Sequence, residues 1–90
     1  MNAVEAPVEI KNRLGLHLRA ASTLAQTVLK FKSQVTIIKG KNEVSARSVT
    51  GLMMLGAGQG TKLKLRVEGE DAADAMKAIK KLFDDKFGED

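Results

Sequence analysis

With 90 residues, of which 43% are hydrophobic, the chain has room for one domain, residues 1–90, with a single small core. The absence of cysteine excludes a disulfide scaffold and a thiolate metal site. No stretch approaches the roughly 20 apolar residues of a membrane span, and residues 1–11 lack the apolar run of a signal peptide. We therefore expect a cytoplasmic protein without membrane contact, and a monomer by default.

The formal net charge of +4 would attract acidic partners or nucleic acid. The basic residues are spread along the chain, however, instead of forming one block. The aromatic residues Phe31, Phe83 and Phe87 fall outside the strand patterns, so a predicted sheet offers no platform on which bases could stack. We expect no nucleic-acid partner, and a small RNA-binding α/β module is only a weak alternative.

The first two predicted elements flank a turn. Residues 4–10 alternate apolar and polar side chains, which is typical of a half-buried strand. Pro7 cannot donate a ladder hydrogen bond, so this strand should lie at a sheet edge or begin near Val8. After the turn, residues 18–31 follow a helical period whose predicted buried face contains Ala21, Leu24, Ala25, Val28 and Leu29.

The middle of the chain predicts a hairpin and a short helix. Residues 34–39 and 43–46 are two short strand patterns around the turn residues Gly40-Lys41-Asn42. Residues 48–55 favour a helix of about two turns with Ser48 as its N-cap. Residues 61–68 form the most regular alternating pattern, which indicates a strand with one face open to water.

The last helix begins at Asp71, a good N-cap residue, with Asp74 in the position of a weak capping box. Gly88 suits its end. The order strand–helix–strand–strand–helix–strand–helix predicts an α+β fold, a four-stranded antiparallel sheet with three helices on one face. The predicted core face of the last helix contains Ala72, Ala75, Met76, Ile79, Leu82, Phe83 and Phe87.

The only histidine lies in the turn at residues 14–21, where a helical pattern begins. A helix start leaves backbone N–H groups unpaired and carries partial positive charge, which favours anions. No Ser, Thr, Asp or Asn stands between Arg13 and Ala21, so either His17 caps those groups or they stay free for a negative ligand. Arg19 adds a guanidinium nearby. We hypothesise that a neutral His17 accepts a phosphoryl group, which these donors then stabilise.

Periodicity alone allows simpler interpretations. A surface histidine that happens to begin a helix is the more common case. One histidine without cysteine, and without His-x-x-x-His or EF-hand spacing, makes a metal site a poor hypothesis. A Ser-His-Asp triad could be drawn, but no Gly-x-Ser-x-Gly motif supports it. We expect neither a metal nor a cofactor.

Two motifs favour the phosphoryl-acceptor hypothesis over a plain surface histidine. The segment Gly15-Leu16-His17-Leu18-Arg19-Ala20-Ala21 resembles the phosphohistidine signature of the HPr family, the phosphocarriers of the phosphoenolpyruvate-dependent phosphotransferase system. The segment from Ala46 to Gly56 is similar to the short-helix region of that family, with Ser48 at the position of its regulatory serine. The resemblance runs from about Val8 to Phe87.

The resemblance implies a phosphocarrier and not an enzyme. Phosphorylated enzyme I would pass a phosphoryl group to Nδ1 of His17, and the carrier would deliver it to an enzyme IIA domain. Arg19 and the backbone N–H groups of Leu18 and Arg19 would stabilise the group. An HPr kinase/phosphorylase would phosphorylate Ser48, and the partners would dock on Leu18, Val49, Thr50, Met53 and Met54.

The chain departs from the family pattern at two positions. Ala20 stands where the family usually has proline. Unlike proline, alanine has a backbone N–H, so this replacement restores a donor and loosens the first turn. Leu18 is bulkier than the usual small residue and could alter partner choice. The stretch at residues 82–87 also resembles the nitrogen-related branch, NPr. A regulatory relay not coupled to sugar uptake is therefore the alternative to a carrier of the sugar system.

Overall fold

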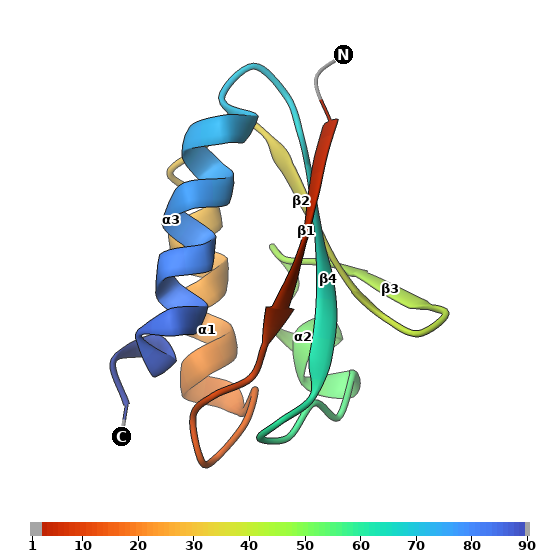
Figure 1. Cartoon of the computed structure of the whole chain (residues 1–90), viewed down its shortest axis with the longest axis vertical. Helices are drawn as coiled ribbons and strands as arrows, with labels where there is room; N and C mark the ends of the chain where they lie inside the picture. Colours follow the sequence, from red (N-terminus) through yellow and green to blue (C-terminus); the bar gives the residue numbers. More distant parts are fainter. Residues whose placement is uncertain (1–2, 90) are drawn as a thin grey trace.

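The computed structural model describes residues 3–89 and has the predicted α+β architecture (Figure 1). Four strands form one antiparallel sheet in the order β1-β4-β2-β3. Three helices cover one face of the sheet, and a short 3₁₀ turn, η1, follows the last helix. The elements are β1 (Ala3–Glu9), α1 (Leu18–Val28), β2 (Gln34–Lys39), β3 (Asn42–Ser45), α2 (Val49–Met54), β4 (Lys62–Glu68), α3 (Ala72–Asp84) and η1 (Lys86–Gly88).

The alternation of β4 decides which side of the sheet faces the helices. Leu63, Leu65 and Val67 are buried, whereas the side chains between them lie on the open face. Within the described part of the chain, β1 is an edge strand whose one neighbour is β4, so the missing N–H of Pro7 costs no central ladder bond, as predicted. Val4, at the start of β1, is 38% exposed and is not part of the core.

The prediction for the end of the first helix was wrong. α1 ends at Val28, and Leu29 is 63% exposed instead of buried. The amides of Lys30 and Phe31 donate to the carbonyls three residues before them, which tightens the chain into 3₁₀-type turns and takes Leu29 off the buried face. The other predicted core residues of α1 are buried, namely Ala21, Leu24, Ala25 and Val28.

The last helix starts where it was predicted to start, but the predicted cap residue, Asp71, does not bond to the helix. Asp71 is the N-cap residue of α3, but its side chain makes no capping hydrogen bond. Its carboxylate instead accepts from the backbone amides of Lys32 and Ser33, at 2.8 and 2.9 Å. The hydroxyl of Ser33, more than any other group, lowers the pKa of Asp71, and the two amides add to this effect. The carboxylate thus connects α3 to the start of β2.

The end of the last helix also differs from the prediction. α3 stops at Asp84, and the backbones of Lys86 and Phe87 turn into the left-handed region with φ of 57° and 56°. Phe87 is nevertheless buried, as predicted, because η1 folds back against α3. Met76 and Leu82 are only partly buried. Among residues 3–89, no helix is long and apolar enough to cross a membrane.

Candidate functional site

A tight turn after β1 presents the histidine. Asn12 is fully buried; its backbone carbonyl accepts from the amide of Gly15, and its side-chain amide donates to the carbonyl of Gly15 at 2.7 Å. Gly15 has a φ of +73°, and a Cβ there would lie 2.7 Å from the carbonyl oxygen of Ala57. The next amide, of Leu16, donates to that same oxygen at 2.9 Å. Only glycine permits this close approach, which fixes the position of the following residue, His17.

His17 is the N-cap residue of α1, with an extended backbone and no side-chain capping bond. The first intrahelical hydrogen bond joins the amide of Ala21 to the carbonyl of His17, at 2.8 Å. The amides of Leu18, Arg19 and Ala20 therefore find no acceptor within residues 3–89. Of the two predicted alternatives, the one with free donors is confirmed. The imidazole is 30% exposed, so it is accessible from solvent.

The imidazole has a partner that sequence analysis did not identify, Glu89. Nε2 of His17 lies 2.6 Å from Oε2 of Glu89, a residue 72 positions further along the chain. The other oxygen, Oε1, accepts from the side-chain amide of Asn12 at 2.9 Å. Burial by itself would raise the pKa of Glu89, but the hydrogen bonds from Asn12 and His17 and the charges of His17 and Arg19 together lower it.

Residues 87–89, which include the imidazole's partner Glu89, form one wall of a hollow of about 340 Å³. Arg19, which was predicted to lie beside the histidine, lines this hollow. Arg13, which was not singled out from the sequence, lines it as well. Both guanidinium groups line a hollow close to the helix start, which suits an anion. The hollow is lined by Arg13, Leu14, Arg19, Phe87, Gly88 and Glu89.

The predicted docking residues lie on α1 and α2, which pack against each other. Figure 1 shows α2 and the first turn of α1 at the same end of the molecule. Leu18, Met53 and Met54 are 59%, 42% and 80% exposed. Thr50 is exposed too, but Val49 is half-buried and packs against the core.

Ser48 begins α2 as predicted. Its hydroxyl accepts from the amide of Gly51 at 3.0 Å, which satisfies one of the free donors of the helix start. The side chain is exposed, so a kinase could reach its oxygen. Both Leu52 and Leu55, on the other side of α2, are buried in the core.

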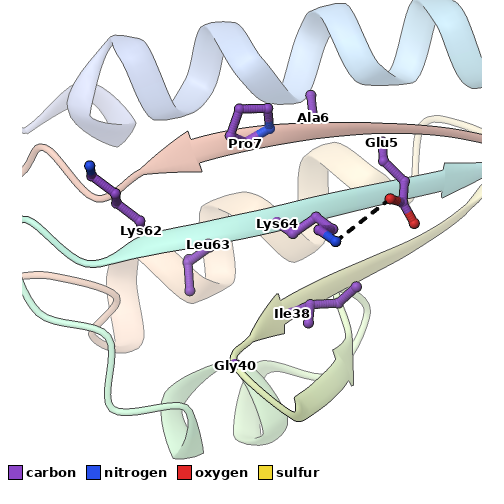
Figure 2. Close-up of a pocket in the computed structure, with 8 residues that line it drawn as sticks. All are labelled: Glu5, Ala6, Pro7, Ile38, Gly40, Lys62, Leu63 and Lys64. Atoms are coloured by element: carbon purple, nitrogen blue, oxygen red, sulfur yellow. Dashed lines mark ion pairs between the residues drawn. The ribbon is translucent and has the colours of Figure 1, made fainter.

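A second hollow, of about 550 Å³, lies on the open face of the sheet and contains none of the predicted site residues (Figure 2). Two of its charged side chains pair with each other: Lys64 points toward Glu5 with 3.8 Å between nitrogen and oxygen. Arg66, on the same strand, bridges Glu5 and Glu43 at 3.1 and 3.3 Å. This is the arrangement of a solvated sheet face, and we assign no chemistry to it. No cluster of His, Asp or Glu within residues 3–89 could bind a metal ion.

Comparison with known proteins decides the family. The model of the PTS HPr component phosphorylation site matches residues 4–85. The chain belongs to the HPr family of phosphocarriers. It is 44% identical to the phosphocarrier protein HPr of Xylella fastidiosa over 87 residues, which are 97% of this chain and 98% of that protein. It is 45% identical to the phosphocarrier protein NPr of Shewanella violacea over 89 residues, covering 99% and 98% of the two chains.

The HPr fold is also confirmed by solved structures. The crystal structure of HPr-C-His from Thermoanaerobacter tengcongensis matches with a TM-score of 0.92 and 45% identity, covering 97% of this chain and 98% of that one. A structure from the same organism that is described as an HPr dimer matches with a TM-score of 0.77. An HPr is a phosphocarrier and not an enzyme, so the family favours the phosphocarrier hypothesis over the RNA-binding module. Membership implies partners of the phosphotransferase system such as enzyme I and enzyme IIA.

Proposed function

We propose that His17 carries the phosphoryl group, receiving it on Nδ1 from phosphorylated enzyme I and passing it to an enzyme IIA domain. The observation that supports this most directly is the partly exposed imidazole at the N-cap of α1, with three free amides beside it. Nε2 is engaged by Glu89, whereas none of the residues that the structure describes hydrogen-bonds to Nδ1. Nδ1 is therefore the nitrogen that is open to attack a donor.

The transfer is an exchange of one N–P bond for another. The lone pair of Nδ1 forms the new bond to phosphorus while the bond in the donor breaks, and that electron pair stays on the donor nitrogen. The amides of Leu18 and Arg19 and the guanidinium of Arg19 would stabilise the phosphoryl oxygens. Ala20, which replaces the usual proline, adds an N–H at the same helix start. Delivery to enzyme IIA reverses the same steps.

We propose that partners dock on Leu18 and on the exposed residues of α2, Thr50, Met53 and Met54, with Val49 at the edge of this surface. The flexible thioether side chains of methionine suit a surface that must bind enzyme I and enzyme IIA in turn. Phosphorylation of Ser48 by an HPr kinase/phosphorylase would place charge on this docking surface and weaken both contacts.

The chain could work in either of two branches of the family. The main proposal is a carrier in the sugar phosphotransferase system, working in the cytoplasm as a single-domain monomer. The alternative is a regulatory carrier of the nitrogen-related type, which the similar identities to an HPr and an NPr favour equally. Transfer rates to a sugar-specific and to a nitrogen-type enzyme IIA distinguish the two branches.

Incubation with enzyme I and phosphoenolpyruvate tests the proposal. We expect one acid-labile phosphoryl group per chain, absent from His17→Ala and formed more slowly in Arg19→Ala. Circular dichroism of each variant checks that the fold is retained. A wild-type chain that stays unlabelled with enzyme I from its own source would overturn the proposed function.

A further inference from the structure

The contact between His17 and Glu89 decides which ring nitrogen carries the proton. An ionised carboxylate only accepts hydrogen bonds, so a ring nitrogen 2.6 Å away must be the donor. The pKa of Glu89 is lowered, because the hydrogen bonds and charges around it outweigh the effect of its burial, and the group is therefore ionised at neutral pH. In the neutral ring the single proton therefore lies on Nε2, and Nδ1 keeps its lone pair.

Several contacts place Glu89 at this position. Its side chain is only 10% exposed, and its second oxygen accepts from Asn12 at 2.9 Å. Asn12 is fully buried and also donates to Gly15, in the turn that presents His17. The carboxylate is thus connected to both the ring and the backbone that positions the ring.

The backbone before Glu89 is bent to allow the contact. Lys86 and Phe87 adopt positive φ values, a backbone conformation that is strained for non-glycine residues. Phe87 is buried and packs edge-on against Phe83, with ring centroids 4.9 Å apart. Burial of this aromatic ring offsets the strain and directs Glu89 to the imidazole.

We propose that Glu89 is a positioning residue for phosphoryl transfer: it selects the Nε2–H tautomer of His17 and balances the positive charge that the ring acquires on phosphorylation. This inference rests on the proposed function of His17. When Nδ1 forms its bond to phosphorus, the proton stays on Nε2 and the ring becomes cationic. Glu89 stabilises that cation, as a carboxylate does for the imidazolium of a Ser-His-Asp triad. When the group leaves, the N–P electron pair returns to Nδ1 and the neutral tautomer is restored.

Two substitutions separate the two parts of the role. Glu89→Gln keeps an acceptor for Nε2–H but removes the charge, whereas Glu89→Ala removes both. Asp85→Asn is the matched control, since Asp85 is an exposed carboxylate in the same segment that pairs with Lys81 and not with His17. Nitrogen-15 NMR of the imidazole measures the tautomer, and rapid-quench kinetics with phosphorylated enzyme I measure the transfer rate.

We expect Glu89→Gln to retain the Nε2–H tautomer and to accept the phosphoryl group about tenfold more slowly, the loss that corresponds to one charge-assisted hydrogen bond. Glu89→Ala should show a mixture of tautomers and an even lower rate, and Asp85→Asn should match the wild type. A Glu89→Gln rate equal to that of the wild type would refute the charge-balancing role. An unchanged tautomer in Glu89→Ala would refute the selection of the tautomer.

A small chemical donor makes the test independent of enzyme I. Phosphoramidate should phosphorylate the wild type on Nδ1, and Glu89→Ala on both nitrogens, as assigned by NMR of the product. The same product from both chains would contradict the positioning role. If the wild type is modified by phosphoramidate but not by phosphorylated enzyme I, the proposed function fails, while the tautomer and product measurements still test the role of Glu89.

Discussion

Replacing Gly15 by alanine tests whether the turn that presents the histidine depends on a close approach. Two effects add at this position. A left-handed conformation costs an L-residue about 1–2 kcal/mol, and Gly15 has a φ of +73°. The new Cβ would also lie 2.7 Å from the carbonyl oxygen of Ala57 and 2.9 Å from Cα of Gly58, both of them backbone atoms. Relieving such an overlap typically costs about 1–3 kcal/mol.

Two other glycines separate these effects. Gly56 has a similar φ of +64°, but a Cβ there meets nothing within 4 Å. Gly58 also has open space around it and no positive φ. We expect losses in the free energy of unfolding of about 1 kcal/mol for Gly56→Ala and about 3 kcal/mol for Gly15→Ala. Gly58→Ala should cause no loss, or a gain of about 0.4–1 kcal/mol, because alanine restricts the unfolded chain.

Urea denaturation, followed by circular dichroism, measures the three values, which are comparable if the slope m is unchanged. Gly15→Ala should in addition slow phosphoryl acceptance, because the shift of the turn displaces the imidazole from the free amides. If Gly15→Ala and Gly56→Ala lose equal stability, the overlap with Ala57 contributes nothing and our account of the turn is wrong.

Three further predictions follow from individual contacts. Asp71 has a lowered pKa in the folded state, so its stabilising effect is present above its unfolded pKa of about 3.9 and disappears as the pH falls through the folded value. The stability of Asp71→Asn in acid denaturation should therefore depend less on pH than that of the wild type. Asp74→Asn, in the same helical turn, is the control and should not differ from the wild type. Ser48→Ala should lower the free energy of unfolding by about 1 kcal/mol in thermal denaturation, because the cap of α2 is lost. Ser48→Asp still caps the helix and should not lower it. Equal losses in the two variants would show that the loss of the cap does not cause the destabilisation. Met54→Ala should raise the KM of enzyme I for the carrier several-fold without changing the stability of the carrier, because Met54 is exposed on the proposed docking surface. Leu29→Ala, at an exposed side chain just after α1 and outside that surface, should leave the KM unchanged. An effect of Leu29→Ala alone would place the docking surface elsewhere.

The elements with strong periodicity could be predicted from the sequence alone. The alternation of Leu63, Leu65 and Val67 defines both β4 and its buried side, because each residue of a strand faces the side opposite to its neighbours. Pro7 placed β1 at the edge of the sheet, since it lacks the donor that a central strand needs. The turn around His17 could be predicted because an alternating pattern ends before it and a helical pattern begins after it. The absence of a capping residue there allowed the donors at the start of α1 to be free.

Other features depend on contacts between distant segments. Periodicity predicted Leu29 to be buried, but the chain tightens after Val28 to reach β2, and no local pattern encodes that change. Asp71 is a residue type that often caps a helix. Its carboxylate nevertheless accepts from the amides of Lys32 and Ser33, which the packing of α3 brings close. Local propensity cannot reveal such competition.

The sequence by itself determined the order of the elements, the buried face of the sheet and the residue type that can carry a phosphoryl group, because each depends on neighbours a few positions apart. Only the tertiary structure decided which nitrogen of that residue is free. Glu89 and His17 are separated by 72 positions, and the contact arises because Phe87 is buried beside α3 and the backbone bends back toward the start of α1. A hydrogen bond of this kind depends on distance and angle in space, which spacing along the chain does not specify.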